Sequence, residues 1–229
     1  HFFHGKCSDS VYNKMKENMK QFYLLIHSSS LGDTLAATPT LRKLSFVYES
    51  KINVVTHVPE LFKNNPYVNK TFSFDDLRTL NLRKSAKEVF ETFVDIGGKN
   101  KRGIEKKHST IDIRQFHALD LGFCLSESEM EYDFIPEESE AIDDLPEDYI
   151  ALHVGSTWPS RTYEKKNWEE LTKTLTSKNI PVVLVGKNSH ERGFFEIDKK
   201  TIDINVNLGI DLTNKLTLSQ CWNVINKAK

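Results

Sequence analysis

An apolar run followed by a glycine-containing turn and a helical pattern constrains the fold of this chain more than any other feature. Residues 21–27 read QFYLLIH, which is typical of a buried strand. Residues 34–44 read TLAATPTLRKL, which is typical of a helix, and Ser30-Leu-Gly-Asp33 between them predicts a tight turn at Gly32. This order predicts an α/β fold, in which ligands collect at the carboxyl end of the first strand.

Asp33 is the first candidate for a functional residue. The predicted turn places its carboxylate beside a helix N-terminus, which favours the charged form. The structural alternative is that Asp33 caps the helix, and the spacing alone leaves both interpretations open.

Composition limits the classes of function. A chain of 229 residues is long enough for one large domain or two small ones, and its net charge of −1 gives no general attraction to nucleic acid. No apolar run approaches the roughly 20 residues that span a bilayer, and no signal pattern opens the chain, so we expect a cytoplasmic location. Cys7, Cys124 and Cys221 lie too far apart for a metal-like or redox pair, and we expect neither a metal nor a cofactor.

Strand and helix patterns continue to alternate after the first helix. Apolar and β-branched patterns predict strands at 52–57, 70–74 and 92–96, and helices at 59–64, 77–90 and 113–121, the last stopped by Gly122. The basic segment 99–108 fits either a phosphate-contacting loop or a solvated loop.

The clearest domain boundary is residues 135–148, IPEESEAIDDLPED, which contain two prolines and seven acidic residues. We predict a linker here between two Rossmann-like lobes, residues 21–134 and 149–229. In the second lobe, strands are predicted at 149–154 and 181–186, and helices at 168–175, with Asn167 as N-cap, and 218–228. We expect mainly parallel sheets, with residues 23–27 and 150–154 as their central strands.

Several motifs in sequence order carry a resemblance to a known family. They are SLGDTLAATPTLRKL at 30–44, NNPYVN at 64–69, HVGSTW at 153–158 followed by RTY at 161–163 and WEEL at 168–171, and VVLVG at 182–186. The chain resembles glycosyltransferase family 9, the ADP-heptose:lipopolysaccharide heptosyltransferases and their relatives. That resemblance implies a GT-B fold with the active site between two Rossmann-like lobes. It also implies inverting sugar transfer from a nucleotide donor without an obligatory metal.

The resemblance also assigns roles to residues. Asp33 would be the general base that an acceptor hydroxyl needs, with Ser30 and Gly32 on the acceptor side or in the turn. Donor contacts would come from Ser156, Thr157 and Arg161 at the diphosphate and from Glu191 at the nucleoside. Arg161 stands where the family has a lysine, and its guanidinium can make the same phosphate contact. The structural alternatives are turn-stabilising hydroxyls for Ser156 and Thr157, a solvated Arg161, and a helix cap for Glu191.

The implied partners are a nucleotide-diphosphate sugar, with an ADP-sugar favoured, and a glycan or lipid-linked acceptor. Such an acceptor is compatible with peripheral association at the inner face of a membrane. The family's C-terminal D-[ST]-G-x-x-H turn is expected just after residues 224–228, whereas the sequence ends at Lys229. We therefore expect a truncated chain with an incomplete second lobe. A non-catalytic GT-B-like binding domain, or a GT-B enzyme with another donor and acceptor, remains the alternative.

Overall fold

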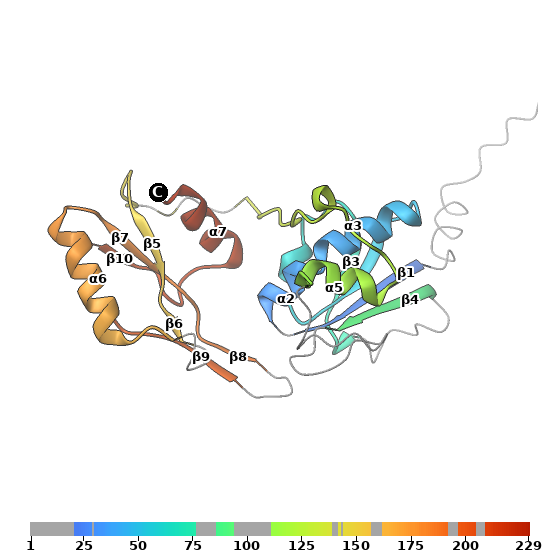
Figure 1. The fold of residues 1–229 in the computed structure, drawn as a ribbon, viewed down its shortest axis with the longest axis horizontal. Coiled ribbons are helices and arrows are strands. Elements are labelled where there is room, and N and C mark those ends of the chain that lie inside the picture. The colour runs from blue at the N-terminus through green and yellow to red at the C-terminus, as the bar shows by residue number, and fades with distance from the viewer. Residues whose placement is uncertain are drawn as a thin grey trace, which may run out of the picture. The chain divides into compact units, whose positions relative to one another are not determined.

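The computed structural model describes most of the chain as two compact units, His1–Phe134 and Ile135–Lys229 (Figure 1). The described residues are 21–28, 30–76, 86–93, 111–138, 142, 144–156, 162–191, 197–204 and 209–229, with 156, 189–191 and 197–200 described by backbone alone. The first 20 residues and the basic segment 99–108 lie outside these ranges.

The first unit contains a parallel sheet in the order β3-β2-β1-β4. Its strands are β1 (Gln21–His27), β2 (Ile52–Val55), β3 (Val68–Phe72) and β4 (Ala86–Phe93). β1 pairs in parallel with β2 on one side and β4 on the other, so that Leu24 aligns with both Val54 and Phe90. The five residues in the middle of β1 are buried, and the prediction of a central parallel strand here is confirmed.

Helices pack on this sheet and on one another (Figure 1). They are α2 (Leu31–Ala36), α3 (Thr38–Val47) and α5 (Ile113–Asp120), with short 3₁₀ turns η1 (Pro59–Phe62) and η4 (Glu127–Glu129). A break at Ala37 separates α2 from α3, because Pro39 has no N–H to continue the helical hydrogen bonds. α5 contacts α2, α3 and β4, and ends before Gly122, whose φ of 85° suits a glycine after a helix.

The second unit contains a parallel sheet in the order β10-β7-β5 and an antiparallel ribbon in the order β6-β9-β8. The parallel strands are β5 (Ile150–His153), β7 (Val182–Val185) and β10 (Gly209–Asp211). The ribbon consists of β6 (Gly155–Ser156), β8 (Ser189–Glu191) and β9 (Ile197–Thr201). Helices α6 (Lys165–Ser177) and α7 (Leu218–Lys227) complete the unit, and a Thr217–Gln220 capping box begins α7.

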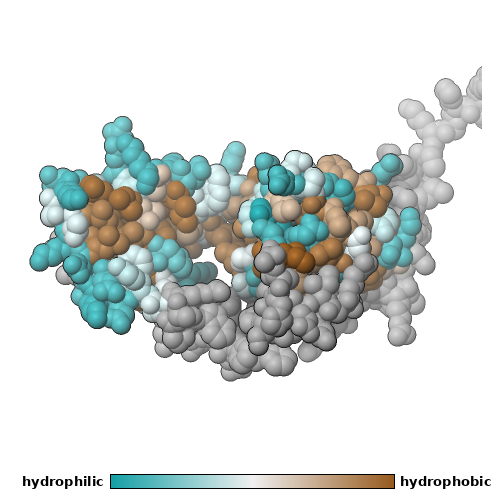
Figure 2. Space-filling view, viewed as in Figure 1, coloured by the Kyte–Doolittle hydropathy of each residue, from teal (hydrophilic) through white to brown (hydrophobic). Residues whose placement is uncertain are grey.

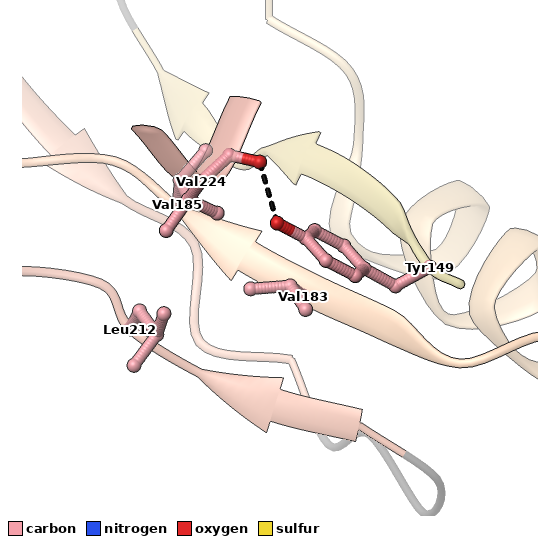
Figure 3. Close-up of a cluster of buried hydrophobic side chains, with 5 residues drawn as sticks. All are labelled: Tyr149, Val183, Val185, Leu212 and Val224. Carbon is pink, nitrogen blue, oxygen red and sulfur yellow. Dashed lines mark hydrogen bonds between the residues drawn. The ribbon is translucent and has the colours of Figure 1, made fainter. Parts of the chain in front are cut away.

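A small apolar core holds α7 to this sheet (Figure 3). It consists of the buried side chains Tyr149, Val183, Val185, Leu212 and Val224. The Tyr149 hydroxyl donates a hydrogen bond of 2.6 Å to the backbone oxygen of Val224, which satisfies a polar group inside the core (Figure 3). Burial also raises the pKa of Tyr149.

The predicted helix at 77–90 is wrong over its described part, because residues 86–93 form strand β4. Residues 77–85 lie outside the described ranges. Ala86, Val89 and Phe90 satisfy a helical spacing, whereas in the strand Val89 and Phe90 lie on opposite faces and Val89 is exposed. Residues 86–93 nevertheless form a strand because they pair with β1 along its whole length. Strand β4 includes residues 92 and 93, the start of the strand predicted at 92–96.

Four further local predictions are corrected by the structure. Strand β5 is not central, because among the described strands β7 lies between β5 and β10. Helix α6 begins earlier than predicted, with Glu164 and not Asn167 at its N-cap. Glu191 does not cap a helix, since it lies in β8. Gly32 does not form the tight turn, because it lies within α2.

On the face seen in Figure 2, the described residues of each unit present both hydrophilic and hydrophobic side chains. Exposed apolar residues include Phe46 and Val47 on α3 and Trp222 and Ile225 on α7. Within the part of the chain that the structure describes, no helix combines the length and apolar character that crossing a bilayer requires.

Candidate active site

Asp33 lies where the central strand of the first unit gives way to helix α2. Ser30 is the N-cap residue of α2, and Asp33 is in the first helical turn with a half-buried side chain. The Ser28 hydroxyl donates to Asp33 Oδ2 over 3.4 Å and accepts from the Ser30 N–H over 3.1 Å. The interpretation of Asp33 as the helix cap is therefore wrong, and its carboxylate stands at the carboxyl end of a central parallel strand, where α/β folds bind ligands.

Gly32 leaves the backbone beside Asp33 open. It is exposed, and a Cβ built at this position would meet no atom of the described residues within 4 Å. The absence of a side chain thus leaves room for another molecule to approach the first turn of α2.

Helix α5 reaches the same turn through His117, which is fully buried. Its Nε2 lies 3.0 Å from the backbone oxygen of Asp33, and its Nδ1 lies 2.8 Å from Thr92 Oγ1 on β4. Asp120, one helical turn further along α5, accepts from Thr92 Oγ1 over 3.3 Å and from the Phe93 N–H over 3.0 Å. A buried polar network therefore links β4 and α5 to the backbone at Asp33.

The N-terminus of α5 is fixed by charge. Asp112 caps the helix by accepting from the Arg114 N–H over 2.9 Å, and its carboxylate also pairs with the Arg114 guanidinium. These hydrogen bonds lower the pKa of Asp112 to about 2. The Arg114 guanidinium also donates to the backbone oxygen of Met130, so α5 is tied to the segment after it.

Four rings lie in a row at or just beyond the carboxyl ends of the strands in the first unit. His57 stacks on Phe74 with centroids 4.5 Å apart, and Phe74 lies 5.0 Å from His27. His27 in turn stacks on Phe93 at 4.3 Å with an interplanar angle of 6°. We call these four residues the aromatic row. His57 is exposed and the other three are partly exposed, so the row presents ring surface at the edge of the sheet where Asp33 lies.

In the second unit, a polar cluster occupies the carboxyl edge of the parallel sheet. Asn188 Oδ1 accepts from the Thr201 N–H over 2.7 Å, and the Asn188 N–H donates to Asn214 Oδ1 over 2.6 Å. The His153 ring, at the end of β5, lies so close to Gly155 that a Cβ there would be 2.6 Å from its Cε1. Glycine at 155 therefore lets the exposed imidazole lie against the backbone at this edge.

The predicted donor residues are described only in part. Ser156 lies in β6 opposite Lys200, and Glu191 lies in β8 opposite Ile197, each described by its backbone. Thr157 and Arg161 lie outside the described residues. The predicted convergence of Ser156, Thr157 and Arg161 on one anion remains a prediction.

No cluster of His, Cys, Asp or Glu among the described residues is arranged to hold a metal ion. Sequence reasoning missed Ser28 and His117 as parts of this site. Ser28 lies next to the predicted turn and could have been proposed as a partner for Asp33. No local signal could have identified His117, because it lies 84 residues from Asp33.

Comparison with known proteins gives a family and a fold. The sequence model of glycosyltransferase family 9 (heptosyltransferase) matches residues 103–229, which is more than half of the chain. No curated protein matches the sequence significantly.

Solved structures match the fold at low sequence identity. TibC, an iron-containing dodecameric glycosyltransferase from enterotoxigenic E. coli H10407, aligns with a TM-score of 0.64 at 16% identity, covering 92% of this chain and 52% of that chain. A family 9 glycosyltransferase from Veillonella parvula DSM 2008 gives a TM-score of 0.62 at 12% identity, and the alignment covers 92% of this chain and 75% of that chain. E. coli ADP-heptose lps heptosyltransferase II gives a TM-score of 0.56 at 15% identity, and the alignment covers 92% of this chain and 77% of that chain. The predicted α/β, GT-B-like fold is confirmed, and the chain spans about half the length of TibC.

Proposed function

The chain belongs to glycosyltransferase family 9, and we propose that it takes part in inverting transfer of a sugar from a nucleotide-diphosphate donor to a glycan or lipid-linked acceptor. The observation that carries the proposal is the position of Asp33. Its carboxylate follows the central parallel strand, is held by Ser28, and stands beside the open backbone of Gly32.

In the proposed reaction, Asp33 accepts the proton of an acceptor hydroxyl while that oxygen attacks the anomeric carbon of the donor sugar. The bond from that carbon to the diphosphate oxygen breaks, and the nucleoside diphosphate leaves with the electron pair. Because the attack comes from the face opposite the leaving group, the anomeric configuration inverts. A positioned carboxylate base typically accelerates such a step by about 10²- to 10⁴-fold.

The aromatic row is the proposed acceptor surface. Ring faces pack well against the apolar faces of sugars, and the row lies at the same edge of the sheet as Asp33. Exposed His57 and partly exposed Phe74 are its accessible end. We expect Phe74→Ala to raise the KM for the acceptor several-fold while the KM for the donor stays unchanged.

Donor contacts are proposed at Ser156, Thr157, Arg161 and Glu191, as the family resemblance implies. Charged and hydroxyl groups near the diphosphate would stabilise the negative charge that develops on the leaving group. A TibC structure is described as a complex with ADP-D-beta-D-heptose, which supports an ADP-sugar as the donor here. A lipid-linked acceptor would place the reaction at the cytoplasmic face of a membrane.

The proposal is tested by assaying the protein at its natural length with ADP- and UDP-linked sugars and a lipopolysaccharide-type acceptor. We expect acceptor-dependent release of ADP and a product with inverted anomeric configuration by NMR. Transfer to a different acceptor or from a UDP-sugar would indicate a GT-B enzyme of other specificity. Failure to bind any nucleotide would favour a non-catalytic binding domain.

Isothermal titration with ADP tests the donor residues separately. Arg161→Ala should weaken binding by about 1.5–3 kcal/mol, the usual value of a charge-assisted hydrogen bond. The matched control is Lys173→Ala, which removes an exposed positive charge from helix α6. If both variants bind ADP as tightly as the unmodified protein, the assignment of Arg161 to the diphosphate is wrong.

A further inference from the structure

The backbone oxygen of Asp33 lies in a helical turn where the usual hydrogen bonds are shifted. In a regular α-helix, the N–H four residues further on would donate to it. Here the Ala37 N–H donates instead to Thr34 O over 3.2 Å, where α2 breaks before α3. Pro39 has no N–H for Leu35 O, and the Thr38 hydroxyl donates to that oxygen over 2.8 Å. Side-chain donors therefore add to the backbone hydrogen bonds of this break, where Leu35 O also accepts from a backbone N–H.

His117 supplies such a donor for Asp33. A backbone oxygen can only accept, so the contact of 3.0 Å requires a proton on Nε2 of the ring. That requirement is met both by the neutral tautomer protonated at Nε2 and by the imidazolium. The hydrogen bond to Asp33 is therefore compatible with either charge state of His117. Donation from the Thr92 hydroxyl to Asp120 uses that hydroxyl's single proton, so in this arrangement Nδ1 also donates and the ring is an imidazolium.

Thr92 and Asp120 fix the other side of the ring. The Thr92 hydroxyl lies between His117 Nδ1 and Asp120 Oδ2, at 2.8 and 3.3 Å. Asp120 is itself held by the Phe93 N–H on β4. All three side chains are buried, with exposed fractions of 0% for His117 and Thr92 and 7% for Asp120. Because burying polar groups is costly unless they are bonded in one arrangement, the network gives the ring a defined orientation.

We propose that His117 is a positioning residue. By donating from Nε2 to the Asp33 carbonyl, it fixes the first turn of α2 and with it the direction of the Asp33 carboxylate. Ser28 holds the carboxylate itself, so the side chain and the backbone of Asp33 are each held by a separate group. This inference rests on the proposed role of Asp33 as the base.

The expected effect is on turnover more than on substrate affinity. A displacement of about 1 Å in a reacting group can lower a rate by about 10²-fold, because the near-attack geometry is lost. His117 is buried in the first unit and has no exposed surface to offer a substrate. Loss of the Nε2 donor should therefore lower kcat and leave both KM values close to those of the unmodified protein.

The matched variants His117→Gln and His117→Asn separate positioning from general structural support. The Gln amide nitrogen is as many bonds from Cβ as His Nε2, so it can still donate to Asp33. The Asn nitrogen corresponds to Nδ1 and is too short to reach. We expect His117→Gln to keep kcat within about threefold of the unmodified protein, and His117→Asn to lower it by about 10- to 100-fold at unchanged KM.

Two controls make the result decisive. Asp33→Asn is assayed in parallel, because only its loss of turnover establishes the base on which the inference rests. If Asp33→Asn is inactive while folded His117→Gln and His117→Asn have equal kcat, the proposed function stands and the positioning role is wrong. If Asp33→Asn is active, the proposed base is wrong, whatever the His117 variants do.

A second pair covers the case in which His117 variants do not fold. Thr92→Ser keeps the hydroxyl that orients the ring, whereas Thr92→Val keeps the shape and removes the hydroxyl. We expect Thr92→Val to lower kcat several-fold and Thr92→Ser to leave it unchanged. Equal kcat for the two folded variants would overturn the proposed role of the network.

Discussion

The first described strand of each unit is apolar, but the two strands occupy different positions in their sheets. β1 is buried along its centre and pairs on both sides, whereas β5 is only partly buried and pairs among the described strands with β7 alone. The elements after the two strands also differ. β1 leads within a few residues into helix α2, while β5 leads into β6 of an antiparallel ribbon.

An apolar strand with glycine and hydroxyl residues after it therefore does not determine the next element. In the first unit, such a sequence produces a helix whose first turn carries Asp33. In the second unit, Gly155 and Ser156 extend the chain to pair with β9. The outcome depends on partners that are distant in sequence, which for β6 are Lys200 and Thr201.

The largest expected difference between the two strands is in stability. Leu24 is fully buried between β2 and β4, so Leu24→Ala should lower the free energy of unfolding by about 2–5 kcal/mol. Leu152 on β5 is only partly buried, and Leu152→Ala should cost about 1–2 kcal/mol.

Urea unfolding can assign each loss to its unit. All three tryptophans of the chain, Trp158, Trp168 and Trp222, lie in the second unit, so their fluorescence reports on that unit, whereas circular dichroism reports on both. Leu152→Ala should shift the fluorescence transition, and Leu24→Ala should shift the part seen by circular dichroism. Equal losses for the two variants would contradict the contrast between β1 and β5.

Replacing the glycines that follow the buried strands β7 and β1 with alanine should change stability in opposite directions. Gly186, after β7, has a φ of 146°, and a Cβ there would lie 3.2 Å from Thr201 Cγ2, so Gly186→Ala should destabilise by about 1–3 kcal/mol. Gly32 lies in a helix with open space around it, so Gly32→Ala should stabilise by up to about 1 kcal/mol. Thermal unfolding of both variants measures the two signs, and destabilisation by Gly32→Ala would show that its conformation is not helical.

A smaller expected effect is the pH dependence of stability that comes from carboxyl groups in the first unit. Lowered carboxyl pKa values occur in the first unit at Asp76, Asp112 and Glu129. Burial raises pKa values in both units, at Tyr48 and Asp133 in the first and at Tyr149 and Cys221 in the second. The folded pKa of Asp112, about 2, lies below its unfolded value of about 3.9. Its contribution to stability is therefore present above about pH 4 and is lost as the pH falls toward 2.

Asp112→Asn tests this contribution, because asparagine can still cap helix α5 but cannot titrate. Between about pH 4 and pH 2, the urea midpoint of the unmodified protein should fall more steeply than that of Asp112→Asn. Parallel curves over this range would mean that the pairing with Arg114 does not persist in solution.

Much of the fold could be predicted from local patterns. The strands at β1, β2, β3, β5 and β7 and the helices α3, α5, α6 and α7 match apolar runs or helical spacings that have few alternatives. Strand β4 could not be predicted, because Ala86, Val89 and Phe90 have a helical spacing and only pairing with β1 produces the strand. The central position of β7 also depends on pairing with β10, which no local pattern contains.

Only those residues of the candidate site that lie close together in the sequence could be predicted. The importance of Asp33 can be inferred from its place between a buried strand and a helix, and Ser28 is near enough to have been inferred. His117 was predicted to lie on a helix, but nothing in the sequence indicates that its ring contacts the backbone of Asp33. The aromatic row likewise gathers residues from the ends of several strands, and only the sheet order brings them together.

The role of Asp33 as the base for sugar transfer can be tested by measuring the turnover of Asp33→Asn in the protein at its natural length. The matched control is Glu60→Gln, which neutralises an exposed carboxylate on η1. We predict that Asp33→Asn lowers kcat by about 10²- to 10⁴-fold with an unfolding curve close to that of the unmodified protein, while Glu60→Gln changes neither. A folded Asp33→Asn variant with kcat close to that of the unmodified protein would show that Asp33 is not the base.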